Sequence, residues 1–319
     1  MTKIKISIIG PGIMSIPPKG WGAVETLIWD MRNALIRLGC EVDIINLRDS
    51  IEIIKQVNLF KPDFVHIHYD DWFVLYPYIQ YPCACTSHFG YLERPKMFGG
   101  YVNTVNTFSK IKPRIFCLSE GIKNVYKVLM NISEDKLYIT PNGVNCNAFR
   151  NTDTPKYSDR SLYLAKIDYR KRQHMFQSID SLWYAGNIAD NRFNQNKNYL
   201  GEWSKETLYN NLTEYGNLVL LSDGEAHPLV CMEALAAGLG VVVCQWGAAN
   251  LDTSKEFITV IPENKISDIA YVESKMIENR EYSRHHRKDI LEYSKQFDWI
   301  NVMKDIYVPI VEKIVSESK

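Results

Sequence analysis

Blocks of apolar and polar residues alternate regularly over the first fifty positions. An apolar run at 4–9 predicts a strand, and a loop rich in glycine and proline follows at 10–22. Apolar residues then recur at helical spacing up to Gly39, which ends the predicted helix. A second strand is predicted at 41–47. Strand, helix and strand in this order indicate a βαβ unit and therefore a parallel sheet.

The same alternation continues through the rest of the chain. Apolar runs predict further strands at 64–68, 83–87, 115–118 and 137–139 and, after a polar stretch at 150–156, at 161–165, 181–184, 198–201, 218–221, 241–244 and 259–261. Helices are predicted near 204–214, 229–237 and 265–279, and residues 281–319 are predicted to be mostly helical. We therefore expect two doubly wound α/β domains, at 1–155 and 156–296, and a C-terminal helix at 297–319 that packs back on the N-terminal domain.

Composition excludes several classes of protein. The 37 basic residues equal the 37 acidic ones, so the chain of 319 residues has no net charge and no general attraction for nucleic acid. The seven cysteines lack disulfide or zinc spacing, which indicates reduced thiols in a cytoplasmic setting. The N-terminus does not resemble a signal peptide, and no apolar run reaches the roughly 20 residues that span a bilayer.

The segment 224–233 carries the clearest chemical signal. Glu225 and Glu233 flank Pro228, which stands where a proline can open a helix, and Gly238 stands where a glycine can close it. A helix N-terminus presents unpaired N–H groups and partial positive charge, so it suits an anionic or hydroxyl-rich ligand. Because Glu233 lies among apolar neighbours, its carboxylate needs a hydrogen-bonding partner. Sugar hydroxyls are suitable partners.

A second signal follows the first strand of the C-terminal half. Lys166 and Lys171 lie in the loop that leaves this strand, at the sheet edge where ligands of such folds bind. Two lysines there can both point at one diphosphate and offset the charge that builds on a leaving group. Lysines in loops are more often simply solvated, so this pattern gains weight only beside the paired glutamates.

In combination, these motifs resemble the retaining glycosyltransferases of family 4. The resemblance covers nearly the whole chain in order, from the glycine-rich segment 17–25 through Thr86-Ser87-His88, Asn142-Gly143-Val144, Lys166 with Lys171, the paired-glutamate helix and Phe297-Asp298-Trp299. It implies the GT-B fold: two facing Rossmann-like domains with parallel sheets and a ligand cleft between them. It also implies transfer of a sugar, with retention of configuration, from a nucleoside-diphosphate sugar to an acceptor hydroxyl.

The resemblance further implies a role for each matching residue. Lys166 and Lys171 would contact the diphosphate of the donor, and Glu233 would bind the ribose hydroxyls. Glu225 would hold the transferred sugar together with the backbone amides near His227 to Leu229. In the N-terminal domain, Gly22 would let the backbone approach the diphosphate, and His88 would lie close to the anomeric carbon. Asn142 and Gly143 would line the crossing between the domains.

Three departures from the family pattern concern the donor-binding domain. Lysine stands at Lys166 where arginine is frequent, so a bidentate fork becomes a point charge. Pro228 replaces a common glycine, which removes one N–H donor. Only 53 residues separate Lys171 from Glu225, and the first helix of this domain is expected to be shortened or replaced by residues 172–178. The chain is thus expected to be a short member of the family.

The resemblance implies chemistry that needs no metal. It also implies no cofactor, because the nucleotide sugar is itself a substrate. No D-x-D pair occurs, and Asp70 and Asp71 are adjacent rather than spaced for a bridging cation. A UDP- or GDP-sugar is expected as donor, and a glycan, lipid-linked or protein hydroxyl as acceptor. Five basic residues form a cluster in the N-terminal domain: Arg94, Lys96, Lys110, Lys112 and Arg114. Such a cluster is usually just solvated, and contact with a membrane surface is the alternative.

We expect the substitution Lys171→Ala to lower turnover much more than it lowers stability.

Simpler interpretations and rival functions remain. His88 could be a core histidine, Gly22 could merely start a helix, and Glu225 could be a solvated loop carboxylate. An NAD-dependent oxidoreductase is disfavoured because Ser15 stands where the dinucleotide fingerprint that begins at Gly10 needs its third glycine. A catalytically degenerate nucleotide-sugar binder or assembly protein of the same fold stays as the alternative.

Overall fold

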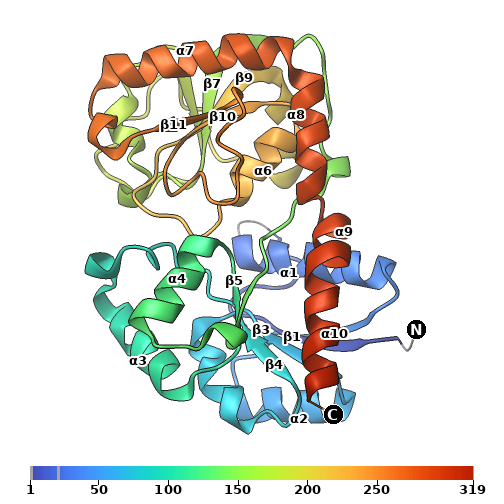
Figure 1. The fold of residues 1–319 in the computed structure, drawn as a ribbon. Coiled ribbons are helices and arrows are strands. Elements are labelled where there is room, and N and C mark those ends of the chain that lie inside the picture. Colours follow the sequence, from blue (N-terminus) through green and yellow to red (C-terminus); the bar gives the residue numbers. More distant parts are fainter. Residues whose placement is uncertain (1–2, 20–21, 319) are drawn as a thin grey trace. The chain divides into compact units, whose positions relative to one another are not determined.

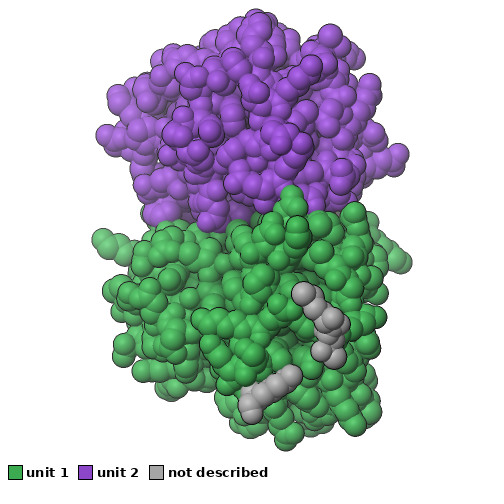
Figure 2. Space-filling view, turned by 45° about the vertical axis from the view of Figure 1, so that its right-hand side comes forward, with its two compact units in different colours: residues 1–143, 299–319 green, residues 144–298 purple. Residues whose placement is uncertain are grey.

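The computed structural model of the protein describes residues 3–19 and 22–318. The chain divides into two compact units, coloured separately in Figure 2: unit 1 comprises residues 1–143 and 299–319, and unit 2 comprises residues 144–298. The first division follows Gly143, whereas the polar stretch at 150–156 had suggested a boundary after residue 155. The chain returns to unit 1 at Trp299, so the C-terminal helices belong to that unit.

Unit 1 is built on a six-stranded parallel sheet with the order β2-β1-β3-β4-β5-β6. The strands are β1 (Lys5–Ile9), β2 (Glu41–Ile45), β3 (Phe64–Ile67), β4 (Cys83–Cys85), β5 (Ile115–Cys117) and β6 (Leu137–Ile139). Most of the central strand residues are fully buried, as expected for a sheet covered on both faces. The strand order reverses between β1 and β3, and ligands of doubly wound folds bind at such a reversal, at the carboxyl ends of the strands.

Helices cover this sheet (Figure 1). They are α1 (Ala23–Arg37), α2 (Ser50–Phe60), α3 (Val102–Ile111), α4 (Glu120–Leu129), α9 (Trp299–Val302) and α10 (Val308–Glu317). Asp49 and Ser119 cap the N-termini of α2 and α4 by accepting backbone N–H bonds, a common way to satisfy these donors. Between α9 and α10 the chain forms a π-helical turn, Met303–Tyr307, and α9 packs against α1.

Unit 2 has a five-stranded parallel sheet with the order β11-β10-β9-β7-β8. Its strands are β7 (Tyr157–Leu164), β8 (Leu182–Ala185), β9 (Tyr215–Leu220), β10 (Gly240–Cys244) and β11 (Ile258–Ile261), and its helices are α5 (Lys205–Asn211), α6 (Leu229–Ala236), α7 (Ile269–His285) and α8 (Arg287–Ser294). The order reverses between β7 and β9. The loops that follow these two strands therefore meet at the preferred ligand edge.

Most of the predicted elements are confirmed, with two corrections. The strand predicted at 198–201 is wrong: this segment makes one isolated bridge, between Tyr199 and Tyr184, at the edge beside β8. The helix predicted at 265–279 instead spans Ile269–His285, because Asp268 caps it by accepting from the N–H of Tyr271. The shortened crossover predicted at 172–178 is confirmed, since it contains only the 3-10 turn Gln173–Phe176.

The cysteines agree with the prediction of reduced thiols. All seven are free, and every one except Cys146 is buried. Across residues 3–19 and 22–318, no helix combines the length and the apolar character needed to cross a membrane.

Candidate functional site

The strand reversal in unit 2 brings together two predicted site residues that are far apart in the sequence. Lys171 lies in the loop after β7 and Glu225 in the loop after β9. Lys171 is 8% exposed and Glu225 is 7% exposed, and Lys171 Nζ donates to Glu225 Oε1. A buried ion pair therefore lies at the edge of the sheet where a ligand is expected.

Arg170 joins this pair from the other side of the carboxylate. Its Nη1 lies 3.2 Å from Glu225 Oε2 and also donates to the carbonyl oxygen of Gly224 at 2.7 Å. Burial by itself would raise the pKa of Glu225, but Lys171 and Arg170 together hold this pKa below its ordinary value. Glu225 is therefore an ionised carboxylate between two cations, which rules out its interpretation as a solvated loop carboxylate.

The backbone around Lys171 is held by side chains of the same unit. The carboxylate of Asp168 accepts from the N–H of Lys171 at 3.0 Å. The buried hydroxyl of Tyr163, on β7, donates to the carbonyl oxygen of Lys171 and accepts from the N–H of Leu221 at 2.9 Å. Tyr163 thus ties the loop after β7 to the loop after β9. The positions of the two site residues are coupled through this hydroxyl.

Helix α6 begins directly after the Glu225 loop. Pro228 occupies its N-cap position, and Leu229 is its first residue. The helix therefore starts one position later than it would if Pro228 were its first helical residue. His227 is buried immediately before it. Gly238 follows the last turn with φ +79° and closes the helix, as predicted from the sequence. The N–H of Cys231 donates to the carbonyl oxygen of Pro228 at 3.2 Å. The N–H groups of Leu229 and Val230 precede it at the start of α6, where helical N–H groups lack intrahelical partners, and are available to an anion.

Glu233 lies inside α6 and is 9% exposed. The partner that its carboxylate requires is Lys205, the first residue of α5, whose Nζ donates to Glu233 Oε1 at 2.9 Å. The Lys205 side chain is 43% exposed, so it covers Glu233 from the solvent side. A ligand hydroxyl that binds Glu233 must therefore share the carboxylate with Lys205 or displace it.

Lys166 differs from Lys171 in its surroundings. It is exposed in the loop directly after β7 and makes no ion pair within the described part of the chain. Its side chain is therefore free to meet an anionic ligand, whereas Lys171 is already neutralised by Glu225. Because Lys171 lies in a buried pair, the expectation that Lys171→Ala would spare stability has to be revised.

In unit 1, the predicted site residue His88 follows β4 and belongs to a row of histidines. His88 Nε2 lies 3.2 Å from His68 Nδ1, and His68 Nε2 lies 2.9 Å from His66 Nδ1. Burial lowers the pKa of all three rings, to about 4 for His88. His88 is thus more than a core histidine satisfied by backbone, since it is half-buried and ends a chain of ring-to-ring hydrogen bonds.

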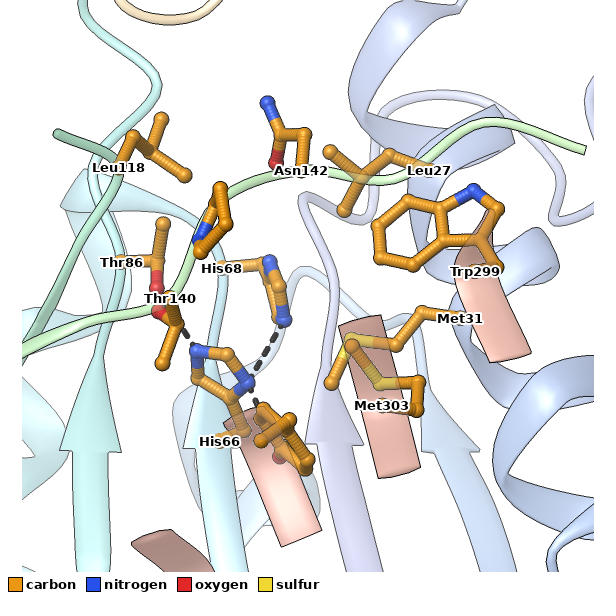
Figure 3. A pocket seen from close by; sticks show the side chains of 12 residues that line it. Leu27, Met31, His66, His68, Thr86, Leu118, Thr140, Asn142, Trp299 and Met303 are labelled. Carbon is orange, nitrogen blue, oxygen red and sulfur yellow. Dashed lines mark hydrogen bonds between the residues drawn. The ribbon is translucent and has the colours of Figure 1, made fainter. Parts of the chain in front are cut away.

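A cavity lies beside this row, at the carboxyl ends of the strands (Figure 3). Its volume of about 20 Å³ is enough for one water molecule. It is lined by the histidines His66 and His68 and by residues of the chain's last helices and of the loop after β6, among them Asn142, Trp299, Met303 and Tyr307. The predicted residue Asn142 therefore lies with the histidines, in one pocket of unit 1.

Gly143 and Gly22 occupy positions with local structural demands. A Cβ on Gly143 would lie 2.6 Å from a ring atom of Trp299, so glycine is needed there for close packing. Gly22 is the N-cap residue of α1, and a Cβ there would lie 2.9 Å from the Glu25 carboxylate. The neighbouring motif residues Gly20 and Trp21 lie outside the described residues. Gly143 thus has a packing reason that stands beside the role implied by the family, whereas the Glu25 carboxylate can move away from a Cβ at Gly22.

Some residues of these clusters were missed from the sequence. Arg170 stands in the same loop as Lys166 and Lys171, but no motif points to it, and Lys205 lies in a helix without a motif. The row that ends at His88 had a usable signal: His66 and His68 are two positions apart on a strand and so share one face. Among the described residues, no group of histidine, cysteine and acidic side chains is arranged to hold a metal ion.

Comparison with known proteins agrees with this architecture. Residues 45–148 match the family model described as Glycosyltransferase Family 4. No curated protein sequence matches the chain. Among solved structures, Anabaena HepE in complex with UDP and glucose superposes with a TM-score of 0.70 at 13% identity, over 98% of this chain and 100% of that one.

Two further structures show the same extent of likeness. The sucrose-phosphate synthase of Thermosynechococcus elongatus matches with a TM-score of 0.70 and 14% identity, over 99% of this chain and 100% of its own. AviGT4, a glycosyltransferase involved in avilamycin A biosynthesis, matches with a TM-score of 0.69 and 14% identity, over 98% of both chains. The chain therefore has the GT-B fold over nearly its full length, and its residues 45–148 match the family 4 model.

Proposed function

We propose that this protein moves a sugar from a nucleoside-diphosphate sugar to an acceptor hydroxyl with retention of the anomeric configuration. The observation that carries the proposal is the cluster of Lys171, Arg170 and Glu225 at the strand reversal of unit 2, directly before the N-terminus of α6. Cations and free helical N–H groups at one sheet edge form a site for a diphosphate.

The donor roles divide between exposed and buried groups. Exposed Lys166 contacts the diphosphate directly, and the two cations Lys171 and Arg170, which share the single carboxylate of Glu225, leave a net positive charge inside the site. Glu233 accepts hydrogen bonds from the ribose hydroxyls and shares its carboxylate with Lys205. The N–H groups of His227 and Leu229, on either side of Pro228, hold the sugar, and Glu225 keeps Lys171 and Arg170 in place. The ion pairs of Glu225 support this positioning role better than they support direct binding of the sugar by Glu225.

From unit 1, His88 contributes close to the anomeric carbon, and Gly22, Asn142 and Gly143 contribute backbone and side-chain contacts. In the reaction the bond from the anomeric carbon to the diphosphate oxygen breaks, and its electron pair stays on that oxygen. The acceptor oxygen bonds to the same face of the sugar, and its proton passes to the departing phosphate oxygen. Positive groups that stabilise the growing phosphate charge lower the barrier.

A UDP-sugar is the first donor to test. The structure of Anabaena HepE in complex with UDP-glucose has the same fold. It superposes on this chain with a TM-score of 0.71 at 12% sequence identity. At this identity the likeness supports the choice of probe only. A thermal-shift panel of UDP, GDP and ADP with their sugars identifies the base, because ligand binding raises the unfolding temperature by mass action.

Transfer itself is measured as release of nucleoside diphosphate from each sugar, with and without EDTA. We expect release in both conditions. Glu233→Gln is expected to weaken nucleotide binding about tenfold or more, since a charged acceptor of hydroxyl hydrogens is lost. Glu278→Gln, on the exposed face of α7, serves as the matched control and leaves binding unchanged. Equal binding by the two variants would contradict the assignment of Glu233.

The alternative is a nucleotide-sugar binder without activity, which the shortened β7-to-β8 crossover favours. The panel separates the two functions. Thermal stabilisation by one nucleotide sugar without release of its diphosphate, in the presence of sugar, glycan and lipid acceptors, would establish the binder and overturn the proposed transfer.

A further inference from the structure

The row of histidines in unit 1 ends in a fixed hydrogen-bond partner. Thr86 Oγ1 donates its one hydrogen to the carbonyl oxygen of Phe116 at 3.1 Å. His66 Nε2 lies 2.8 Å from the same hydroxyl oxygen. With the Thr86 hydrogen given to Phe116, the Thr86 oxygen is left as an acceptor, and His66 donates to it from Nε2. This assigns the tautomer of the first ring.

The assignment then passes along the row. A neutral His66 that carries its proton on Nε2 has an unprotonated Nδ1, which accepts from His68 Nε2 at 2.9 Å. His68 Nδ1 is consequently unprotonated and accepts from His88 Nε2 at 3.2 Å. The same logic leaves the Nδ1 atom of His88 unprotonated. Figure 3 shows His66 and His68 facing one another in the pocket.

The inner end of the row is held by the C-terminal segment. Tyr307, the last residue of the π-helical turn, lies with its hydroxyl 3.2 Å from His66 Nδ1, and its ring stacks on the imidazole at 5.6 Å between centroids. Because His66 Nδ1 is an acceptor, the Tyr307 hydroxyl donates to it. A π-helical turn is rare and often occurs at functional sites. Two donors thus converge on His66 Nδ1 and oppose its protonation.

We propose that His66 and His68 are positioning residues that hold His88 in its Nε2–H tautomer, so that His88 Nδ1 accepts a hydrogen bond from a hydroxyl group of the ligand. The half-buried His88 follows β4 at the carboxyl edge of the sheet. Its Nδ1 makes no hydrogen bond to another residue in the described part of the chain. A ring in this state offers a lone pair and no positive charge.

This state selects the chemistry of the ligand at His88. A neutral acceptor binds the hydrogen of a sugar or acceptor hydroxyl, and it gives no attraction to a carboxylate or phosphate. The hydroxyl belongs either to the transferred sugar or to the acceptor molecule. In this respect the inference rests on the proposed function. Deoxy analogues of the donor sugar and of the acceptor show which of the two molecules supplies the hydroxyl.

Nitrogen-15 NMR of the protein labelled at its seven histidines tests the tautomer directly, without any substrate. His88 is assigned by its loss in His88→Gln. We expect a neutral Nε2–H ring at pH 7 in the wild type. His68→Leu removes both the acceptor and the donor of the middle ring, so His88 should no longer be held in one form and should populate the Nδ1–H tautomer beside Nε2–H. His68→Gln keeps one donor and one acceptor and should preserve the wild-type state.

Two results would overturn the proposal: a His88 ring that is Nδ1–H or charged at pH 7 in the wild type, or a His88 ring that stays entirely Nε2–H in His68→Leu. If His68→Leu does not fold, Thr86→Val replaces it, because this isosteric change removes the partner of His66 Nε2 at the start of the row. A His88 ring that stays entirely Nε2–H in Thr86→Val would equally contradict the relay.

Kinetics supply the second readout. We expect kcat/KM to fall about tenfold to a hundredfold in His68→Leu, the range known for groups that orient metal-bound histidines. Nucleotide affinity, which depends on unit 2, should stay unchanged, and His68→Gln should recover most of the activity. A wild type without transfer activity but with the fixed His88 tautomer would refute the proposed function and leave the relay intact. Equal activity in the two His68 variants would refute the positioning role.

Discussion

Lys171 and Glu225 form a buried ion pair although 54 positions separate them in the chain. The pair is not symmetric in its surroundings. Glu225 Oε2 lies 3.2 Å from Arg170 Nη1, so the carboxylate has a second cation, whereas Lys171 has only Glu225 as a counter-charge among the described residues. Removing one partner or the other should therefore have unequal consequences.

Glu225→Gln is expected to be the more destabilising of the two changes. It leaves the ammonium of Lys171 in a site that is only 8% exposed, without a counter-charge. Loss of one partner of a buried pair typically lowers the free energy of unfolding by about 3–5 kcal/mol. Urea unfolding followed by circular dichroism measures this change, with Glu278→Gln as a surface control.

Lys171→Met is expected to lower the free energy of unfolding by about 1–3 kcal/mol, because Arg170 still neutralises Glu225 and methionine fills most of the lysine volume. Its turnover should be measured at a temperature where circular dichroism shows the variant folded. A larger loss of stability in Lys171→Met than in Glu225→Gln would show that Arg170 does not share the carboxylate.

Lys205→Ala tests the cover over Glu233. Since the Lys205 side chain is 43% exposed, its ion pair with Glu233 should contribute less than about 1 kcal/mol to stability. Its removal frees one oxygen of the carboxylate for ribose, so nucleotide affinity should stay equal or rise. Isothermal titration with the nucleotide chosen by the thermal-shift panel measures it. A tenfold fall in affinity would instead make Lys205 itself a nucleotide contact.

Local signals in the sequence were sufficient to find α6. Pro228 and Gly238 mark its two ends, and the structure places the helix at Leu229–Ala236. The alternating apolar runs likewise predicted most strands, because buried parallel strands are almost continuously apolar. The failure at 198–201 has the same origin: Asn198 to Gly201 reads as a short strand, yet only a single bridge to β8 forms there.

Contacts that depend on strand order could not be predicted in this way. The meeting of Lys171 and Glu225 requires β7 and β9 to be neighbours, although β8 lies between them in the sequence. The contact from His66 to Thr86 similarly depends on the register in which His66 pairs with Ala84. No local spacing encodes these choices, so the sequence predicted the participants of the site better than their partners.

Gly143→Ala tests whether Gly143 is needed for packing. The new Cβ would lie 2.6 Å from the Trp299 ring and 3.0 Å from its Cα, so the indole or its backbone must move. Such overpacking should lower the free energy of unfolding by about 1–3 kcal/mol. Gly100→Ala is the matched control, since nothing lies within 4 Å of a Cβ there. Equal stability of both variants would remove the packing explanation.

Asp70 provides a test of pH dependence that is separate from the histidines. Its Oδ1 accepts from the Tyr101 hydroxyl at 3.0 Å, and the Tyr101 oxygen lies 2.8 Å from Ser87 Oγ. Burial raises the pKa of Asp70 to about 6, against the opposing effect of hydrogen bonds from Ser87 and Tyr101. The folded protein therefore favours the protonated carboxyl more strongly than the unfolded chain does.

The sign of the effect follows from this difference. The stabilisation is fully present below the unfolded pKa of about 4 and is lost as the pH rises through about 6. Between pH 4 and pH 7 the wild type should thus lose up to about 3 kcal/mol relative to Asp70→Asn, which cannot ionise. Urea unfolding of both proteins at pH 4.5, 5.5 and 7 measures the difference in their free energies of unfolding. Protonation of the three neutral histidines at low pH affects both proteins alike, so it cancels in this difference. A difference that stays constant over this range would mean that the carboxyl titrates alike in the folded and unfolded chains, and that Asp70 is already ionised beside Tyr101 at pH 4.5.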